Sequence, residues 1–480
     1  MAGVLLTNNY FLHLDPKQER KMEPYPPLAT LYAAAVLREA GVSVSVHDTV
    51  FDTDTSNVCR AIAQHAGETV VIYDDGFNYL TKMCLVNMRN ACFDMIRTAK
   101  QYNCRVLVSG SDATDHCLDY LQAGADCIII GEAEITLLEL ITGNIPPASI
   151  LGIAFLQDGN LHYTTKRPVL HDLDRLPLPA WDLIDLTPYR NAWKKSRGRF
   201  SINITTTRGC PFKCNWCAKP IYGNRYNSRS PEQVVEEIKL LVQSYGAEHV
   251  WFCDDIFGLK PGWIQQFSIL MQQQSFRIHY KIQCRADVLL NEENIASLAA
   301  SGCDEIWIGA ESGSQKILDA MDKGTTIDQI MNSTALMKKH GIKPCFFLQF
   351  GYPGEEMADI QKTMQMLAEC MPFDIGISIS YPLPGTVFYE RVRAELSDKQ
   401  NWNDSDELLL MYHGTYTPGF YKNLHRYAHQ YFRLLQGWMG MKQRLGLSGN
   451  YWPMPLRRIM ATPYHAISAS AYRLRMQLSK

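Results

Sequence analysis

Apolar segments alternate with amphipathic ones over residues 1 to about 145. The apolar segments read VLLTNNY, VSVSVHDTV, TVVIYDD, CRVLVSG and CIIIGE. Segments between them space apolar residues at the helical period, as in PLATLYAAAVLREAG and KMCLVNMRNACFDMIRTAK. Serial strands and helices predict right-handed crossovers and a parallel sheet covered on both faces. We therefore expect an open α/β sheet here, with ligands bound beyond the carboxyl ends of its strands.

A second alternating stretch covers about residues 196–395. Its predicted strands are FSINITTT, HVWFCDD, YKIQCRAD, EIWIGAE, KPCFFLQFG and DIGISISY. The first helix begins clearly, with Ser230 as N-cap, Pro231 at the first helical position and Gln233 three residues after the cap. Serial βα units of this size predict a barrel or partial barrel, whose chemistry lies at the carboxyl ends of the strands.

Two further segments connect and follow these stretches. Residues 146–195 contain a predicted hairpin, GIAFLQDGNLHYTT with Asp158–Gly159 as its turn, and then the proline-punctuated LDRLPLPAWDLID. We interpret them as a linker between domains.

Residues 396–480 have a mainly helical pattern, with no Asp or Glu after Glu407. The basic residues of that tail are Lys422, Arg426, Arg433, Lys442, Arg444, Arg457, Arg458, Arg473, Arg475 and Lys480. Such a tail forms either a solvated helical face or a surface for anionic lipid or an acidic substrate.

Composition narrows the class of protein. The chain has 480 residues, 46% of them hydrophobic and 20% charged, which allows a large core and argues against disorder. A net charge of -2 and a pI near 6.7 argue against a general nucleic-acid binder. The chain has no apolar run long enough for a membrane span and no signal-peptide pattern at its start. Its 14 cysteines are too scattered for a disulfide scaffold, so we expect a reducing, cytoplasmic setting.

Three cysteines cluster after the first strand of the second stretch. The segment Thr207–Arg–Gly–Cys–Pro–Phe–Lys–Cys–Asn–Trp–Cys places Cys210, Cys214 and Cys217 within eight residues. Three thiolates can hold one face of an iron–sulfur cube, which leaves the fourth iron open to another ligand. A structural zinc site needs four protein ligands, and no histidine or cysteine lies between Cys217 and His249. The spacing therefore favours an iron–sulfur cluster over zinc or ordinary core cysteines.

With Trp216 before its last cysteine, the CxxxCxxC motif resembles that of the radical S-adenosylmethionine enzymes. The resemblance implies a [4Fe–4S] cluster that binds S-adenosylmethionine at its open iron and cleaves it to a 5′-deoxyadenosyl radical. IWIGAESGSQKILDAMDKG, FFLQFGYPGEE and YPLPGTVFYE are similar to the fourth-, fifth- and sixth-strand segments of that family. The implied contacts of S-adenosylmethionine are Arg285, Glu311, Ser312, Gly351, Pro353 and Gly354.

Several of these residues have simpler interpretations. Arg285 and Glu311 could form a structural ion pair in the barrel mouth. Asp254 and Asp255, after the second strand, could be catalytic or could cap the next loop. The other eleven cysteines lie mostly in apolar strands or helices, where cysteine is usually a small core residue.

The first domain resembles the cobalamin-binding domain that precedes the radical core in one large subfamily. After the first strand, TNNYFLHL lacks the G-x-G-x-x-G of a dinucleotide site. Small residues end the fourth and fifth strands instead, and the resemblance implies that cobalamin contacts Ser109, Gly110, Ser111, Gly131 and Glu132. The Asp-x-His-x-x-Gly signature of a histidine ligand to cobalt is absent. The other interpretation is a vestigial domain that only packs on the barrel.

Together these features predict an α/β protein of four parts. They are a Rossmann-like, flavodoxin-type cobalamin domain (1–145), a linker (146–195), a partial (β/α)6 radical S-adenosylmethionine barrel (196–395) and a basic helical region (396–480). The expected activity is methylation or remodelling of an unactivated carbon. Two alternatives are an oxidative cyclase or hydroxylase acting on a tetrapyrrole-like substrate, and an iron–sulfur sensor without turnover.

The resemblance also implies partners. They are a small-molecule, lipid or tetrapyrrole substrate and an electron donor such as flavodoxin or ferredoxin. No nucleic acid is expected, and the basic tail could make peripheral contact with a membrane.

Overall fold

The fold is described from a computed structural model, which covers residues 3–143, 145–219, 221–396, 399–447 and 452–480. Its contacts divide the chain into two compact units. The first comprises Met1–Pro211, Ala218–Tyr280 and Asn401–Glu407, and the second comprises Phe212–Cys217, Lys281–Gln400 and Leu408–Lys480. The four-part division expected from the sequence remains a prediction.

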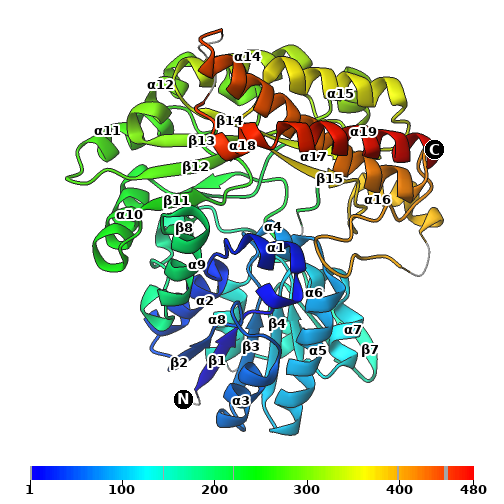
Figure 1. Cartoon of the computed structure of the whole chain (residues 1–480). Helices are drawn as coiled ribbons and strands as arrows, with labels where there is room; N and C mark the ends of the chain where they lie inside the picture. Colours follow the sequence, from blue (N-terminus) through cyan, green and yellow to red (C-terminus); the bar gives the residue numbers. More distant parts are fainter. Residues whose placement is uncertain (1–2, 144, 220, 397–398, 448–451) are drawn as a thin grey trace. The chain divides into compact units, whose positions relative to one another are not determined.

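A largely parallel sheet forms the centre of the N-terminal part of the first unit (Figure 1). Its strands are β1 (Val4–Thr7), β2 (Val44–His47), β3 (Thr69–Tyr73), β4 (Arg105–Ser109), β5 (Cys127–Ile129), β6 (Ile153–Gln157) and β7 (Asn160–Tyr163). They lie in the order β2-β1-β3-β4-β5-β6-β7, and β1 to β5 pair in parallel. The order 2-1-3-4-5 is the flavodoxin-type arrangement, so the predicted fold class is confirmed.

The central strands are buried on both sides because helices cover both faces of the sheet. All of β3 after its first residue is buried, and so is all of β4 after its first residue. The helices of this unit are α1 (Pro16–Lys21), α2 (Leu28–Glu39), α3 (Ser56–Gln64), α4 (Tyr79–Lys82), α5 (Val86–Gln101), α6 (Ser111–Asp115), α7 (Cys117–Gln122), α8 (Glu134–Thr142), α9 (Thr187–Arg197), α10 (Pro231–Tyr245) and α11 (Trp263–Gln272). Such double coverage explains why these strands are almost continuously apolar in the sequence.

The predicted hairpin is present and has a structural role of its own. Strands β6 and β7 pair antiparallel around Asp158 and Gly159, which both have positive φ. β6 also pairs antiparallel with β5. The segment interpreted as a linker therefore begins by extending the first sheet.

A second, parallel sheet carries the strand–helix units predicted over 196–395. Its strands are β8 (Ser201–Ile204), β11 (His249–Phe252), β12 (His279–Cys284), β13 (Cys303–Glu311), β14 (Lys343–Phe350) and β15 (Asp374–Ile379), in the order β15-β14-β13-β12-β11-β8. The pairs β8–β11, β13–β14 and β14–β15 are parallel. This order follows the chain without a reversal, as in an open half-barrel. The expected N-cap is confirmed, because the Ser230 hydroxyl accepts the Gln233 N–H at the start of α10.

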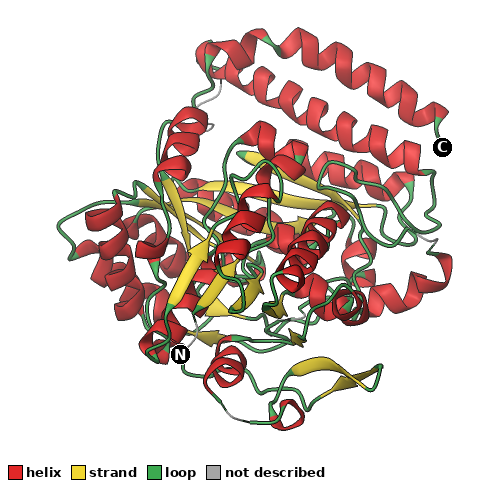
Figure 2. Cartoon of the chain, turned by 90° about the horizontal axis from the view of Figure 1, so that it is seen from below, coloured by secondary structure: helices red, strands yellow, loops and turns green. Residues whose placement is uncertain are grey.

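In the second unit, strands β13 to β15 are accompanied by helices. They are α12 (Glu292–Ser301), α13 (Gln315–Ala320), α14 (Ile327–Lys339), α15 (Met357–Cys370), α16 (Val387–Val392), α17 (Pro418–Arg444), α18 (Leu456–Met460) and α19 (Thr462–Leu478). The two long helices α17 and α19 lie side by side (Figure 2). Within the described part of the chain, no helix is both long and apolar enough to cross a bilayer.

Glycines let α17 and α19 approach closely. A Cβ atom on Gly437 would overlap the Thr462 hydroxyl at the start of α19, and one on Gly440 would lie 2.9 Å from the Cβ atom of Met454, just before α18. Neither position has room for a side chain, so this packing is specific rather than merely apolar.

We expect Gly437→Ala to lower the free energy of unfolding by about 1–3 kcal/mol, since the added methyl group overpacks the helix contact. The loss would appear although alanine is intrinsically about 1 kcal/mol better than glycine inside a helix. Urea titration followed by far-UV circular dichroism measures it. Gly419→Ala on the same helix is the control, because the nearest atom to its added Cβ is 3.8 Å away. Equal stability of the two variants would contradict the packing argument.

Candidate active site

The three cysteines lie on one irregular loop. It follows β9 (Thr207–Arg208), which pairs antiparallel with β10 (Asn227–Ser228). Cys210, Cys214 and Cys217 are partly exposed, whereas ten of the other eleven cysteines in the described chain are buried. Gly209 has a φ of 80°, and a side chain there would collide with the carbonyl of Arg225. Only glycine therefore fits immediately before the first cysteine.

Arg208, two residues before Cys210, is buried in an ionic and aromatic cluster. Its guanidinium donates to Glu132 and, at 2.7 Å, to Glu134, while both carboxylates are themselves buried. Three rings surround the same group, with centroids 5.3–5.5 Å from the guanidinium carbon: Tyr32, Phe77 and Tyr222. Glu132 and Glu134 lie beyond the carboxyl end of β5, so the cluster fixes β9 against that edge of the first sheet.

Asp254 supports the same segment from β11. One carboxylate oxygen accepts the N–H groups of Thr206 and Thr207 at 2.7 and 2.8 Å and the Thr205 hydroxyl at 2.9 Å. The other oxygen accepts the Thr206 hydroxyl at 2.5 Å. Burial raises the pKa of Asp254 to about 6, although these hydrogen bonds lower it. Asp254 thus has a structural role, but it supports the segment that follows β8 and not the next loop.

Asn215, between the second and third cysteines, anchors the loop within the second unit. Its amide nitrogen donates to Ala320 O and Asp322 at 2.8 Å each. Its amide oxygen accepts the Tyr352 hydroxyl at 2.8 Å, and its backbone pairs with Met321 O and Phe388 N. The residue does not stand out in the sequence, since an isolated asparagine carries no recognisable pattern.

Arg285 lies against the cysteine loop. Its guanidinium carbon is 3.7 Å from the centroid of the Phe212 ring, and Nη1 is 3.7 Å from Cys214 Sγ. The other nitrogens donate to Asp287 at 2.9 and 3.1 Å, which fixes the orientation of the fork. Arg285 therefore supports the cysteine loop from the side of Phe212 and Cys214.

Glu311 pairs with Lys323 and not with Arg285. Both side chains are buried, and Lys323 Nζ donates to Glu311 Oε1 at 2.8 Å. The structural ion pair considered between Arg285 and Glu311 is therefore wrong. Burial opposes the charge on Lys323, but attraction to Glu311 and Cys214, together with the hydrogen bond to Glu311, raises the pKa of Lys323 above its ordinary value.

Backbone geometry makes room for this ion pair. Glu311 has a φ of 56°, and the β13–β14 register shifts between Gly309 and Glu311. A Cβ on Gly309 would lie 2.5 Å from Glu311 Oε1 and 2.6 Å from Lys323 Nζ. The Lys323 ammonium is also 5.9 Å from the Trp216 ring, within reach of a cation–π contact. Lys323 is a functional candidate that the sequence pattern did not reveal.

The remaining predicted contacts of S-adenosylmethionine differ in their surroundings. The Ser312 hydroxyl is buried and bonds to Thr363 at 3.2 Å. The Gly351 N–H donates to the buried carboxylate of Glu355 at 2.7 Å. Pro353 is partly exposed, and Gly354 has a φ of 81°. A Cβ atom added to Gly354 would meet no other atom within 4 Å. Gly354 is exposed, so the space beside it is open to solvent.

The predicted cobalamin residues end strands of the first sheet. Ser109 ends β4, and a Cβ on Gly110 would lie 2.8 Å from the Cβ of Asp74. Ser111 is buried, and its hydroxyl has no hydrogen-bond partner among the described residues. Gly131 has a φ of 80°, while both oxygens of Glu132 are engaged, by Arg208 and by the Leu170 N–H. The Ser111 hydroxyl is thus available to a ligand at this edge, whereas both oxygens of Glu132 already accept hydrogen bonds.

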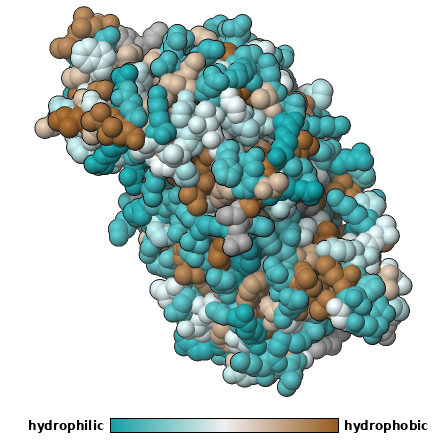
Figure 3. Space-filling view, turned by 90° about the vertical axis from the view of Figure 1, so that its right-hand side faces the viewer, coloured by the Kyte–Doolittle hydropathy of each residue, from teal (hydrophilic) through white to brown (hydrophobic). Residues whose placement is uncertain are grey.

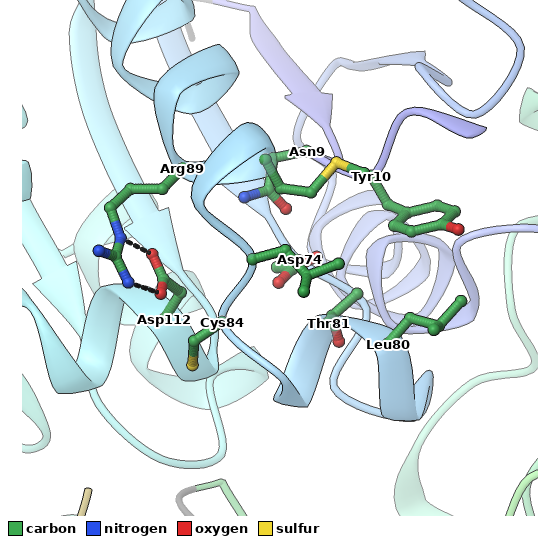
Figure 4. A pocket seen from close by; sticks show the side chains of 10 residues that line it. Asn9, Tyr10, Asp74, Leu80, Thr81, Cys84, Arg89 and Asp112 are labelled. Atoms are coloured by element: carbon green, nitrogen blue, oxygen red, sulfur yellow. Dashed lines mark hydrogen bonds and ion pairs between the residues drawn. The ribbon is translucent and has the colours of Figure 1, made fainter. Parts of the chain in front are cut away.

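A small cavity opens at the same edge (Figure 4). Its lining includes Asp112, which Arg89 holds in two hydrogen bonds of 2.5 and 2.7 Å. Asp74, by contrast, faces no cation in the described structure and accepts the Asp75 N–H. Burial, reinforced by the Asp75 carboxylate, raises the pKa of Asp74 to about 8. Asp74 is therefore largely protonated at neutral pH and can donate a hydrogen bond.

The cysteine loop fits an iron–sulfur cluster by the chemistry of its donors. It offers three partly exposed thiols, and within the second unit Cys214 interacts with the cations Arg285 and Lys323. Among the described residues, no three His, Cys, Asp or Glu side chains converge on one metal position. The loop would therefore have to turn its sulfur atoms inward around a cluster.

Comparison with protein families and curated relatives agrees with this site. Residues 204–367 match the model of the Radical SAM superfamily. An uncharacterised methyltransferase of Pyrococcus horikoshii is 26% identical over 387 residues, which cover 78% of this chain and 81% of that protein. The anaerobic magnesium-protoporphyrin IX monomethyl ester cyclase of Synechocystis is 24% identical over 402 residues, which cover 82% and 78%.

A solved structure shares the fold. The cobalamin-dependent S-adenosylmethionine radical enzyme OxsB, with aqua-cobalamin and S-adenosylmethionine bound, aligns with a TM-score of 0.74 at 15% identity. The alignment covers all of this chain and 72% of that one. The domain before the half-barrel and the helices after it are thus part of the shared architecture.

We expect Arg208→Gln to lower the free energy of unfolding by about 3–5 kcal/mol, because it leaves two buried carboxylates without their cation. Denaturant titration measures the loss, and iron content after anaerobic reconstitution should fall with it. Arg175→Gln is the control, since Arg175 pairs with Asp172 at the exposed surface and the change should cost at most about 1 kcal/mol. Equal effects of the two variants would rule out the proposed positioning of the loop.

Asp74 should make the protein less stable as pH rises. Its folded-state pKa of about 8 exceeds the ordinary value of 3.8, so the folded state retains a proton that the unfolded state has lost. This contribution is full below about pH 4 and disappears as pH rises through 8. Asp74→Asn should therefore reduce the fall in unfolding free energy between pH 5 and 8 by about 2–4 kcal/mol. Denaturant titrations at both pH values measure it, and an unchanged slope would refute the assignment.

Proposed function

We propose, from the premise that the chain is a radical S-adenosylmethionine enzyme, that it methylates or otherwise remodels an unactivated carbon with the help of cobalamin. The superfamily match over residues 204–367 and the methyltransferase relative support radical methyl transfer. The cobalamin-dependent fold neighbour supports a cobalamin site in the first sheet. The observation that carries the proposal is the loop with three partly exposed cysteines, flanked by Arg285 and Lys323.

We assign Cys210, Cys214 and Cys217 as ligands of a [4Fe–4S] cluster. A cluster held there would supply one electron for the reductive cleavage of S-adenosylmethionine to methionine and a 5′-deoxyadenosyl radical, the species that would remove a hydrogen atom from the substrate. Arg285 stacks on Phe212 and faces Cys214, so it orients the loop and balances its negative charge.

We assign S-adenosylmethionine to Glu311, Ser312, Arg285, Gly351, Pro353 and Gly354. The open space at Gly354 supports this assignment, because backbone can approach an adenosine there without a side chain between them. Glu311 and Lys323 form a buried pair of opposite charges, which suits a ligand that carries both an ammonium and a carboxylate.

We assign cobalamin to the edge formed by Ser109, Gly110, Ser111, Gly131 and Glu132. The unpartnered Ser111 hydroxyl supports this placement, whereas Glu132 would have to share its carboxylate with Arg208. The histidines of this domain all lie within 4 Å of carboxylates: His13, His47, His65 and His116. None of them stands in an Asp-x-His-x-x-Gly signature, so a cobalamin bound here would lack a histidine ligand of that type.

The proposed partners follow from the same chemistry. The reaction needs a small-molecule substrate and a one-electron donor such as flavodoxin or ferredoxin. Oxidative cyclisation or hydroxylation of a tetrapyrrole-like substrate is the second candidate, favoured by the similarity to the Synechocystis cyclase. Product mass separates the two, since methylation adds one methylene and hydroxylation adds one oxygen.

The test is S-adenosylmethionine turnover by protein purified and reconstituted without oxygen. After reduction, the protein should contain about four irons per cluster and release 5′-deoxyadenosine or S-adenosylhomocysteine. Cys214→Ala should lose both the iron and the products. Cobalamin, released with cyanide and read from its visible spectrum, should approach one per chain.

Cys59→Ala is the matched control, because Cys59 is also partly exposed but lies outside the loop. It should retain full iron and full turnover. An intact cluster that yields neither product would refute the enzymatic proposal. An active enzyme without cobalamin would refute cobalamin-dependent methyl transfer alone.

A further inference from the structure

Large hydrophobic side chains are concentrated on the outside of residues 438–478. The described residues expose nineteen such side chains, and nine of them lie in this segment. Met460, Tyr464 and Ile467 are 72%, 63% and 73% exposed, and Leu474 and Leu478 are 58% and 80% exposed. Figure 3 shows hydrophobic groups gathered at the upper left of the surface, where these helices lie. Monomeric soluble proteins rarely leave such apolar groups together in water.

These side chains form one continuous stripe. Spacings of three and four residues along α19 place them on a single helix face, with the exposed Ala471 between them. The opposite face is buried at Thr462, Ala469 and Met476, where α19 packs against α17. The helix is thus apolar on two faces, and the described chain covers only the inner one.

Positive charge borders the stripe. Residues 408–480 contain no Asp or Glu and ten Lys or Arg. Exposed cations on α18, on α19 and just after it are Arg457, Arg458, Arg473, Arg475 and Lys480. A surface of this kind has apolar groups to insert and positive charges to attract anions.

We propose that the exposed stripe of α18 and α19 docks the protein on the surface of a bilayer rich in anionic phospholipid. The helix lies in the plane of the interface, its stripe enters the acyl boundary, and the bordering cations meet lipid phosphates. A second copy of this chain fits less well, because a symmetric contact would bring the same positive surfaces together. This inference does not depend on the proposed reaction.

The test is flotation of the full-length protein with vesicles. Vesicles that contain phosphatidylglycerol should bind the protein about tenfold more tightly than vesicles of phosphatidylcholine alone, and added salt should weaken that binding. The double variant Ile467→Asp, Leu474→Asp should lose binding about tenfold or more, because it places carboxylates in the stripe. Arg473→Gln with Arg475→Gln should weaken binding to anionic vesicles only.

The matched control is Leu156→Asp with Tyr163→Asp on the hairpin of the first unit. Those side chains are also exposed, at 37% and 61%, and their change should leave vesicle binding intact. Circular dichroism checks that each variant is folded. Equal binding by the stripe variant and the wild type would overturn the proposal. So would a stripe variant that only converts a dimer to a monomer, since the face would then belong to a second copy.

Discussion

The guanidinium of Arg208 lies between the carboxylates of Glu132 and Glu134, and this contact holds β9 against the segment that follows β5. Burying a cation between two anions costs desolvation, so the arrangement is stable only while every partner keeps its position. Surrounding aromatic rings exclude water and add cation–π attraction. Because Gly209 follows directly, the position of β9 fixes where the cysteine loop leaves the sheet.

Polar contacts also fix the elements further along the site, and the side chains that make them are buried. Asp254 accepts hydrogen bonds from the backbone before the loop. Both the nitrogen and the oxygen of the Asn215 amide form hydrogen bonds inside the second unit. Gly309 leaves the space in which Glu311 meets Lys323. The supports of the loop are thus in place before any ligand arrives, which reduces the entropy that binding must overcome, and only the cysteine side chains have to turn inward around a cluster.

The sequence was informative where a pattern repeats and uninformative where a contact joins distant residues. Periodicity located the strands, cap residues located α10, and the small residues after β4 and β5 marked the edge of the first sheet. No pattern revealed that Arg208 pairs with residues more than seventy positions earlier, or that Lys323 takes the place expected for Arg285. The β6–β7 hairpin and its turn could be predicted, but the pairing of β6 with β5 depends on an exposed strand edge that only the folded sheet presents.

Composition likewise showed that the last segment is basic, but it could not show which helix face is left uncovered. Close packing determines which face is uncovered. Gly437 lets α17 pack against Thr462, and this contact buries one side of α19. The stripe from Met460 to Leu478 contributes nothing to this contact. Changes in the stripe should therefore leave the helix pair and the cysteine loop intact, which makes surface binding and cluster assembly experimentally separable properties of one chain.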